Sequence, residues 1–161
     1  ILKGIHLLPS DYALAQIEKT WSNIEASDSV LTPTQCIEAL EHIGTQQSLD
    51  MLARIAEEAA GQQKYLLVPE RALRAIQKVS LVGRDGWLVR FLQQNDQDRH
   101  IVLRAIDMLG MTGNRQALPI IQQFFENHPS ERIRYIAFWA IHNICKATNE
   151  VWYNGEEAGS V

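Results

Sequence analysis

The sequence contains few of the residues that mark several structural classes. Two cysteines, Cys36 and Cys145, are too few for a disulfide framework in a chain of 161 residues. Nine glycines, five prolines and a charged content of 21% exclude a collagen-like or wholly disordered chain. No apolar run approaches the roughly 20 residues that a transmembrane helix needs, so we expect no membrane span.

The sequence also lacks an excess of positive charge. Fifteen lysines and arginines stand against 19 aspartates and glutamates, which gives a net charge of −4 at pH 7. This balance argues against a dedicated nucleic-acid-binding protein, although a local basic patch stays compatible with it. The chain begins with Ile1 rather than methionine, so we expect a processed form or a piece of a longer protein. Asn-x-Ser/Thr sites are absent, and these features slightly favour a soluble cytoplasmic protein without identifying its compartment.

A short pattern occurs four times along the chain: alanine, then isoleucine or leucine, two mostly polar residues, an aliphatic residue and a small residue. It begins at Ala39, Ala75, Ala105 and Ala140, at spacings of 36, 30 and 35 residues. A nearly constant spacing in this range indicates stacked helical units. Between the repeats, apolar residues follow the helical period and no long segment alternates with period two, so we expect no strands.

These signals predict an all-α protein, an α-solenoid of about four helical pairs in one domain over residues 1–150. The predicted pairs are 10–26 with 32–44, 46–60 with 68–81, 84–95 with 97–110, and 114–127 with 130–147. Five glycines stand where these helices should end, because the residue after a helix often needs a positive φ: Gly44, Gly61, Gly83, Gly110 and Gly113. Residues 151–161 lack an apolar stripe, and we expect a loose C-terminal tail there.

The chain resembles the HEAT-like repeats, in the short form found in phycobilin lyase subunits and many bacterial proteins. The resemblance rests on residues 98–110 and 133–141, which match the second helix of such a repeat, and on residues 116–121, which match the first helix. It covers about residues 30 to 147. The family is an armadillo-like α-solenoid that serves mostly as a scaffold for protein–protein interaction, so the resemblance implies a fold and says little about chemistry.

The resemblance implies that the second helix of each pair lines a concave surface. If the repeated alanine is packed inward, the residues one before it and two after it point outward. Tryptophan, tyrosine and arginine are residues that anchor protein interfaces. The sequence therefore predicts a partner-binding surface made of Glu38, Arg74, Arg104, Asp107, Tyr135, Trp139 and His142.

Each part of this surface also has a structural interpretation. Trp139 is either an interface anchor or a cap over the open end of the repeat core. Arg74 and Arg104 either bind a partner or form a solvated ladder of ion pairs with Glu41 and Asp107. At the arginine position of the repeat, the resemblance favours a structural role, such as hydrogen bonding to a neighbouring helix end, for Arg99 and Arg134.

Catalytic and metal-binding patterns are sparse. His142 and Cys145 lie three residues apart, a spacing that could place a metal-ligand or nucleophile–base pair on one helical face. A zinc site needs three or four ligands, and the sequence has no second histidine–cysteine pair. We therefore expect Cys145 to fill a core position, and we assign no catalytic residue, no metal and no cofactor.

Three functions are compatible with these features. The first is a non-catalytic scaffold that binds a protein partner, or another segment of a longer parent chain, through its concave surface. The second is a bilin lyase subunit or lyase-like chaperone, on the resemblance alone. The third is a HEAT-like DNA-binding or repair protein, which the negative net charge and the acidic Glu38, Glu41, Glu70 and Asp107 oppose. The sequence identifies neither the partner nor the oligomeric state.

Overall fold

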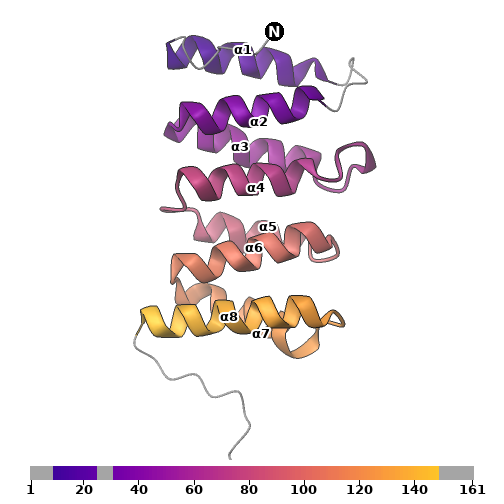
Figure 1. The fold of residues 1–161 in the computed structure, drawn as a ribbon, viewed down its shortest axis with the longest axis vertical. Helices are drawn as coiled ribbons and strands as arrows, with labels where there is room; N and C mark the ends of the chain where they lie inside the picture. Colours follow the sequence, from indigo (N-terminus) through magenta and orange to yellow (C-terminus); the bar gives the residue numbers. More distant parts are fainter. Residues whose placement is uncertain (1–8, 25–30, 149–161) are drawn as a thin grey trace, which may run out of the picture. The chain divides into compact units, whose positions relative to one another are not determined.

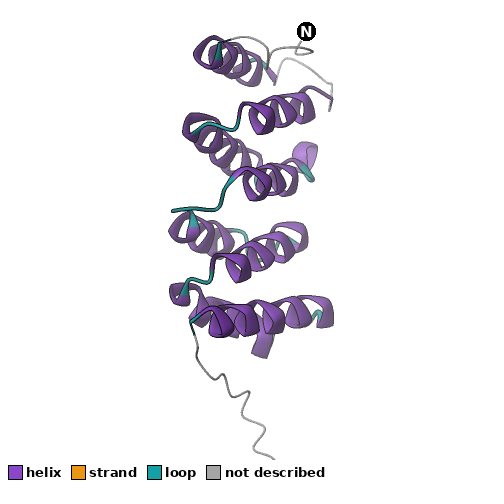
Figure 2. Ribbon diagram, turned by 60° about the vertical axis from the view of Figure 1, so that its left-hand side comes forward, coloured by secondary structure: helices purple, strands orange, loops and turns teal. Residues whose placement is uncertain are grey.

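The protein is helical throughout the part that can be described. A computed structural model describes residues 9–24 and 31–148, and these residues form α-helices joined by short loops, with no β-strand among them (Figure 2). The prediction of an all-α protein is therefore confirmed. None of the helices in these two segments is both long enough and apolar enough to cross a bilayer.

The order of the elements follows the predicted helical pairs closely. The helices are α1 (Ser10–Ser22), α2 (Leu31–Ile43), α3 (Gln46–Ala59), α4 (Val68–Val79), α5 (Asp85–Gln94), α6 (Arg99–Thr112), α7 (Leu118–Asn127) and α8 (Glu131–Ala147) (Figure 1). Short 3-10 helices, η3 (Gln63–Tyr65) and η4 (Arg115–Ala117), precede α4 and α7. The predicted tail, 151–161, lies outside the described residues.

Two boundaries differ from the prediction by four residues. Helix α1 ends at Ser22 rather than near residue 26, and α7 begins at Leu118 rather than near residue 114. Pro119 stands in the first turn of α7, where its missing N–H leaves no hydrogen bond unmade. The preceding residues form η4, whose first turn is closed by the Asn114 side chain accepting from the Gln116 N–H at 2.9 Å.

Four of the five expected helix-ending glycines have the predicted backbone. Gly44, Gly61, Gly83 and Gly113 all have positive φ, between 63° and 77°. Gly110 is the exception, because it lies inside α6, which continues to Thr112. The prediction that Gly110 ends a helix is therefore wrong, and the reason for a glycine there is its close contact with α8.

The chain divides into two compact units, which we describe separately. Within the described residues, the first unit comprises 9–24, 31–81 and 95–104, and the second comprises 82–94 and 105–148. Helix α6 thus contributes its first residues, through Arg104, to the first unit and the rest to the second.

In the first unit, α2 packs on α1, α3 and α4, and α3 packs on α4. The side chains between them are fully buried and aliphatic: Ile17, Leu40, Leu52, Ile55, Leu73, Ile76 and Ile101. Burial of one such side chain stabilises the fold by about 1.5–3 kcal/mol relative to exposure. The helical pattern read from the sequence therefore corresponds to a real apolar core.

In the second unit, α7 packs on α8, and α6 approaches α8 closely. Its core contains Leu88, Phe91, Leu92, Ile106, Met108 and Ile121. As expected from the arginine position of the repeat, Arg134 bonds a helix end: its Nη1 donates to the His128 carbonyl at 2.7 Å and to the Pro129 carbonyl at 3.2 Å. This arginine therefore fastens the turn between α7 and α8.

The repeated alanines are packed inward in all four repeats. Ala39, Ala75, Ala105 and Ala140 are all buried, and so are the aliphatic residues that follow them, Leu40, Ile76, Ile106 and Ile141. Each alanine lies on a second helix, α2, α4, α6 or α8. The outward direction of the neighbouring positions, on which the predicted surface depends, follows from this burial.

Candidate functional site

The predicted surface residues lie on the second helices, as expected, and fall into both units. Glu38 is on α2, Arg74 is on α4, and Arg104 is on the part of α6 that belongs to the first unit. The remaining four belong to the second unit: Asp107 on α6, and Tyr135, Trp139 and His142 on α8. All seven are exposed or half-buried. The structure brings Arg74 and Arg104 together in the first unit, and it brings Tyr135, Trp139 and His142 together in the second.

The set in the first unit is organised around one carboxylate. Glu70 Oε1 accepts a hydrogen bond from Arg74 Nη2 at 3.0 Å, and from Arg104 Nη2 at 3.0 Å and Nε at 3.2 Å. Arg104 Nη1 also donates to Gln77 Oε1 at 3.1 Å. We call these four residues, Glu70, Arg74, Gln77 and Arg104, the Glu70 network. It joins α4 to the start of α6.

The ion pairs include partners that the predicted ladder did not contain. Arg74 and Arg104 share Glu70, whereas Glu41 pairs with Lys78, whose Nζ lies 2.8 Å from Glu41 Oε1. The Lys78 side chain is 59% exposed, so solvent weakens that pair to well below about 1 kcal/mol. The side chains of Arg104 and Glu70 are only 24% and 16% exposed, so their hydrogen bonds stabilise the fold more strongly.

The environment of Glu70 favours its charged form. Partial burial acts to raise the pKa of Glu70, but hydrogen bonds from Arg104 and Arg74 and their positive charges outweigh this effect. The net result is a pKa below the ordinary value of 4.5. Glu70 therefore stays ionised at neutral pH and holds the two guanidinium groups on the surface of the first unit.

The set in the second unit is an aromatic group on α8. The Trp139 ring meets Tyr135, Phe138 and His142 edge-on, with ring centroids 6.3, 5.8 and 5.5 Å apart. We call these four residues the α8 aromatic cluster. Tyr135 is 61% exposed and Trp139 is 44% exposed. Phe138 also contacts Phe125 of α7 at 6.1 Å, which anchors the cluster to the core of its unit.

The two sets consist of charged hydrogen-bonding groups and aromatic rings. His142 is exposed and Cys145 is buried, so the helix presents the two side chains to different surroundings. Among residues 9–24 and 31–148, no three histidine, cysteine or acidic side chains are grouped closely enough to hold a metal ion. Both sets offer what protein interfaces use, namely charged hydrogen-bonding groups and partly exposed aromatic rings.

With this geometry in view, the chain was compared with known proteins. Protein-family models, curated proteins and solved structures give no match to it.

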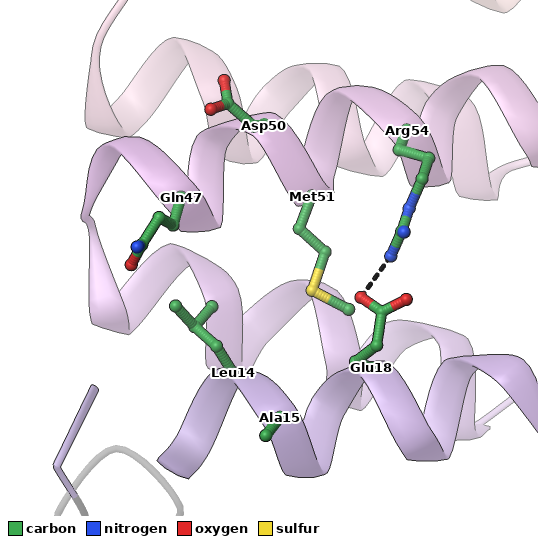
Figure 3. A pocket seen from close by; sticks show the side chains of 7 residues that line it. All are labelled: Leu14, Ala15, Glu18, Gln47, Asp50, Met51 and Arg54. Carbon is green, nitrogen blue, oxygen red and sulfur yellow. Dashed lines mark hydrogen bonds and ion pairs between the residues drawn. The ribbon is translucent and has the colours of Figure 1, made fainter. Parts of the chain in front are cut away.

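Sequence analysis missed a hollowed surface on the first helices. Two hollows, of about 480 and 330 Å³, lie along α1 and α3 in the first unit. Their lining includes Glu18 and Arg54, which form an ion pair between the two helices (Figure 3). No motif marks these residues, because the hollows arise from the spacing between two helices that are far apart in the sequence.

Proposed function

We propose that this protein is a HEAT-like repeat scaffold that binds a protein partner, or another segment of a longer parent chain. In this proposal the helices form an α-solenoid of four pairs, α1 with α2, α3 with α4, α5 with α6, and α7 with α8. The second helices, α2, α4, α6 and α8, form its concave, partner-binding surface, which we call the second-helix surface. The protein carries out no chemistry of its own.

The contacts between second helices support such a stack. In the first unit, Lys78 of α4 pairs with Glu41 of α2, and Glu70 of α4 pairs with Arg104 of α6. In the second unit, the backbone of α6 at Gly110 lies against Ala140 of α8. Helical repeats stack through neighbours of this kind, each second helix touching the next.

The observation that carries the proposal is the exposure of the α8 aromatic cluster. A tryptophan that caps a core is expected to cover apolar residues of other helices. Trp139 is 44% exposed, and its aromatic neighbours within the described residues, Tyr135, Phe138 and His142, are all on its own helix. A group of aromatic rings that stands partly in solvent resembles an interface hot spot more than a cap.

A pull-down with paired variants tests the proposal. The wild type and the double variant Arg104→Glu, Trp139→Ala are used to capture proteins from a lysate of the source organism. A control variant, Tyr12→Ala with Arg90→Glu, makes the same kinds of change at exposed residues of the first helices α1 and α5. Circular dichroism first establishes that all three proteins are equally helical.

We expect a protein captured by the wild type and by the control variant but lost by Arg104→Glu, Trp139→Ala. Equal capture by all three proteins contradicts the assignment of the second-helix surface. Loss by the control variant alone moves the interface to the first helices.

A further inference from the structure

The two hollows along α1 and α3 are parts of one groove. The larger is lined by Leu14, Ala15, Glu18, Gln47, Asp50, Met51 and Arg54, and the smaller by Glu18, Trp21, Ser22, Ile24, Arg54, Glu58, Gln62 and Tyr65. Glu18 and Arg54 line both hollows and form an ion pair with each other (Figure 3). We call the whole the α1–α3 groove. It lies entirely within the first unit.

The floor of the groove is apolar at both ends. Leu14, Ala15 and Met51 supply aliphatic surface in the larger hollow, where the Met51 side chain extends between α3 and α1 (Figure 3). Trp21 and Tyr65 supply aromatic surface in the smaller one, with ring centroids 6.3 Å apart. An occupant must therefore bring apolar groups to contact this floor.

The charged lining of the groove is acidic. Three carboxylates, Glu18, Asp50 and Glu58, face one cation, Arg54, which leaves a net charge of −2. Arg54 is already engaged, because it pairs with Glu18 and lies 3.7 Å from Glu58 Oε1. The smaller hollow also lies at the last turns of α1 and α3, where helix carbonyls add partial negative charge. These carboxylates favour positive charge on an occupant.

The smaller hollow has two further features that suit a cationic side chain. The Trp21 indole N–H donates to Glu58 and so holds this carboxylate beside the aromatic rings. Lys64 Nζ already lies 5.5 Å from the centre of the Tyr65 ring, so that ring accepts a cation over its face. The Tyr65 hydroxyl is buried and has no hydrogen-bond partner within the described residues.

We propose that the α1–α3 groove binds a short segment of a partner protein in which basic side chains alternate with aliphatic ones. A basic side chain occupies the smaller hollow against Glu58, Trp21 and Tyr65. An aliphatic side chain occupies the larger hollow against Leu14, Ala15 and Met51. This site is distinct from the second-helix surface, and the proposal does not depend on that surface binding anything.

The test uses a fluorescein-labelled peptide in which leucine and arginine alternate, together with the same peptide carrying glutamate in place of arginine. Fluorescence anisotropy gives the dissociation constant at low ionic strength. Methyl NMR spectra follow the Met51 and Leu14 signals and so locate the bound peptide. We expect the arginine peptide to bind and to shift these signals, and the glutamate peptide to do neither.

Two substitutions on α3 provide a matched pair. Asp50 and Glu57 are both exposed residues of α3, but only Asp50 lines the groove. Asp50→Lys should weaken binding of the arginine peptide about five- to tenfold, because an attraction becomes a repulsion, whereas Glu57→Lys should change it less than about twofold. Ala15→Phe places a ring in the larger hollow from an exposed position and should also weaken binding.

Three results would overturn the proposal. They are equal binding of the arginine and glutamate peptides, equal weakening by Asp50→Lys and Glu57→Lys, and binding that leaves the Met51 and Leu14 methyl signals unmoved. Circular dichroism of each variant separates loss of the groove from loss of the fold. Since none of the variants touches α4, α6 or α8, failure here leaves the proposed scaffold function standing.

Discussion

Gly110 of α6 and Ala140 of α8 are in such close contact that no side chain fits between them. A β-carbon built on Gly110 would lie 2.7 Å from the α-carbon of Ala140 and 2.8 Å from its β-carbon. Real β-carbons essentially never approach other atoms this closely. The glycine therefore allows the two second helices of this unit to approach closely, at a site where helix propensity alone would favour alanine.

Gly110→Ala should destabilise the protein although alanine is the better helix former. Alanine gains about 1 kcal/mol of helix propensity, but separating α6 from α8 costs about 2–3 kcal/mol in overpacking, because the added β-carbon meets backbone as well as side-chain atoms. We expect a net loss of about 1–2 kcal/mol in the free energy of unfolding, measured with urea. Gly86→Ala is the control, because Gly86 is also helical and its added β-carbon meets only Arg90 Nη1, at 3.9 Å. If both variants are equally stable, the close contact with Ala140 does not require a glycine at position 110.

The Glu70 network should make stability depend on acid pH. The pKa of Glu70 is lower in the folded state, so the unfolded chain takes up the proton first as the pH falls. The stabilisation is fully present above the ordinary pKa of 4.5 and is lost as the pH falls through the lower folded value. At neutral pH, Glu70→Gln should cost about 1–2 kcal/mol, and this difference should shrink progressively below pH 4.5. If the stability difference between the wild type and Glu70→Gln stays constant with pH, the Glu70 network does not make stability depend on acid pH.

Cys36 should be unreactive and should affect stability at alkaline pH. Its side chain is fully buried, and burial raises the pKa of the thiol from 9.0 to about 11. The folded state therefore disfavours the thiolate, and stability should fall as the pH rises from 9 towards 11. The free energy of unfolding is measured with urea for the wild type and Cys36→Ala at several alkaline pH values. The difference between the two proteins separates the pH dependence due to Cys36 from that of other titrating groups. Rapid labelling of Cys36 by a thiol reagent in the native protein would contradict its burial.

Truncation of Trp139 distinguishes an interface anchor from a core cap. Its aromatic neighbours within the described residues are all on α8, and the residue is 44% exposed. Trp139→Ala should therefore cost about 1 kcal/mol or less in stability. A tryptophan that caps the core would cost about 3–5 kcal/mol when truncated. Thermal unfolding of the wild type and Trp139→Ala measures the difference in stability. A loss of about 3–5 kcal/mol would establish that Trp139 caps the core.

The sequence predicted what depends on periodicity. The repeated alanines, from Ala39 to Ala140, marked the second helices because a buried alanine recurs in each. Most of the helix ends at glycines were also predicted, because the residue after a helix often needs a positive φ. Gly110 was misassigned because the same residue type also serves close helix packing, and only the position of Ala140 shows which role applies. The sequence likewise did not show that two arginines share Glu70, because charged residues at the outward positions of successive helices do not determine which of them pair.

The α1–α3 groove could not be predicted for a related reason. Glu18 and Arg54 are separated by 36 residues, and nothing in either neighbourhood suggests that they meet. A hollow is a property of the distance between two helices rather than of either sequence. Periodicity gives the face that each helix buries, but it gives neither the spacing of the helices nor the space left between them.

Site-specific photocrosslinking tests the binding role of the second-helix surface most directly. A photoreactive benzoylphenylalanine replaces Tyr135, which is 61% exposed, or Val82, which is 88% exposed and lies outside the α8 aromatic cluster. After irradiation in a lysate of the source organism, we expect one discrete adduct from position 135 and none of that mass from position 82. The Trp139→Ala substitution, in the same unit as Tyr135, should reduce the yield of that adduct. The absence of a discrete adduct at position 135, or the same adduct in equal yield from both positions, would contradict a binding role for this surface.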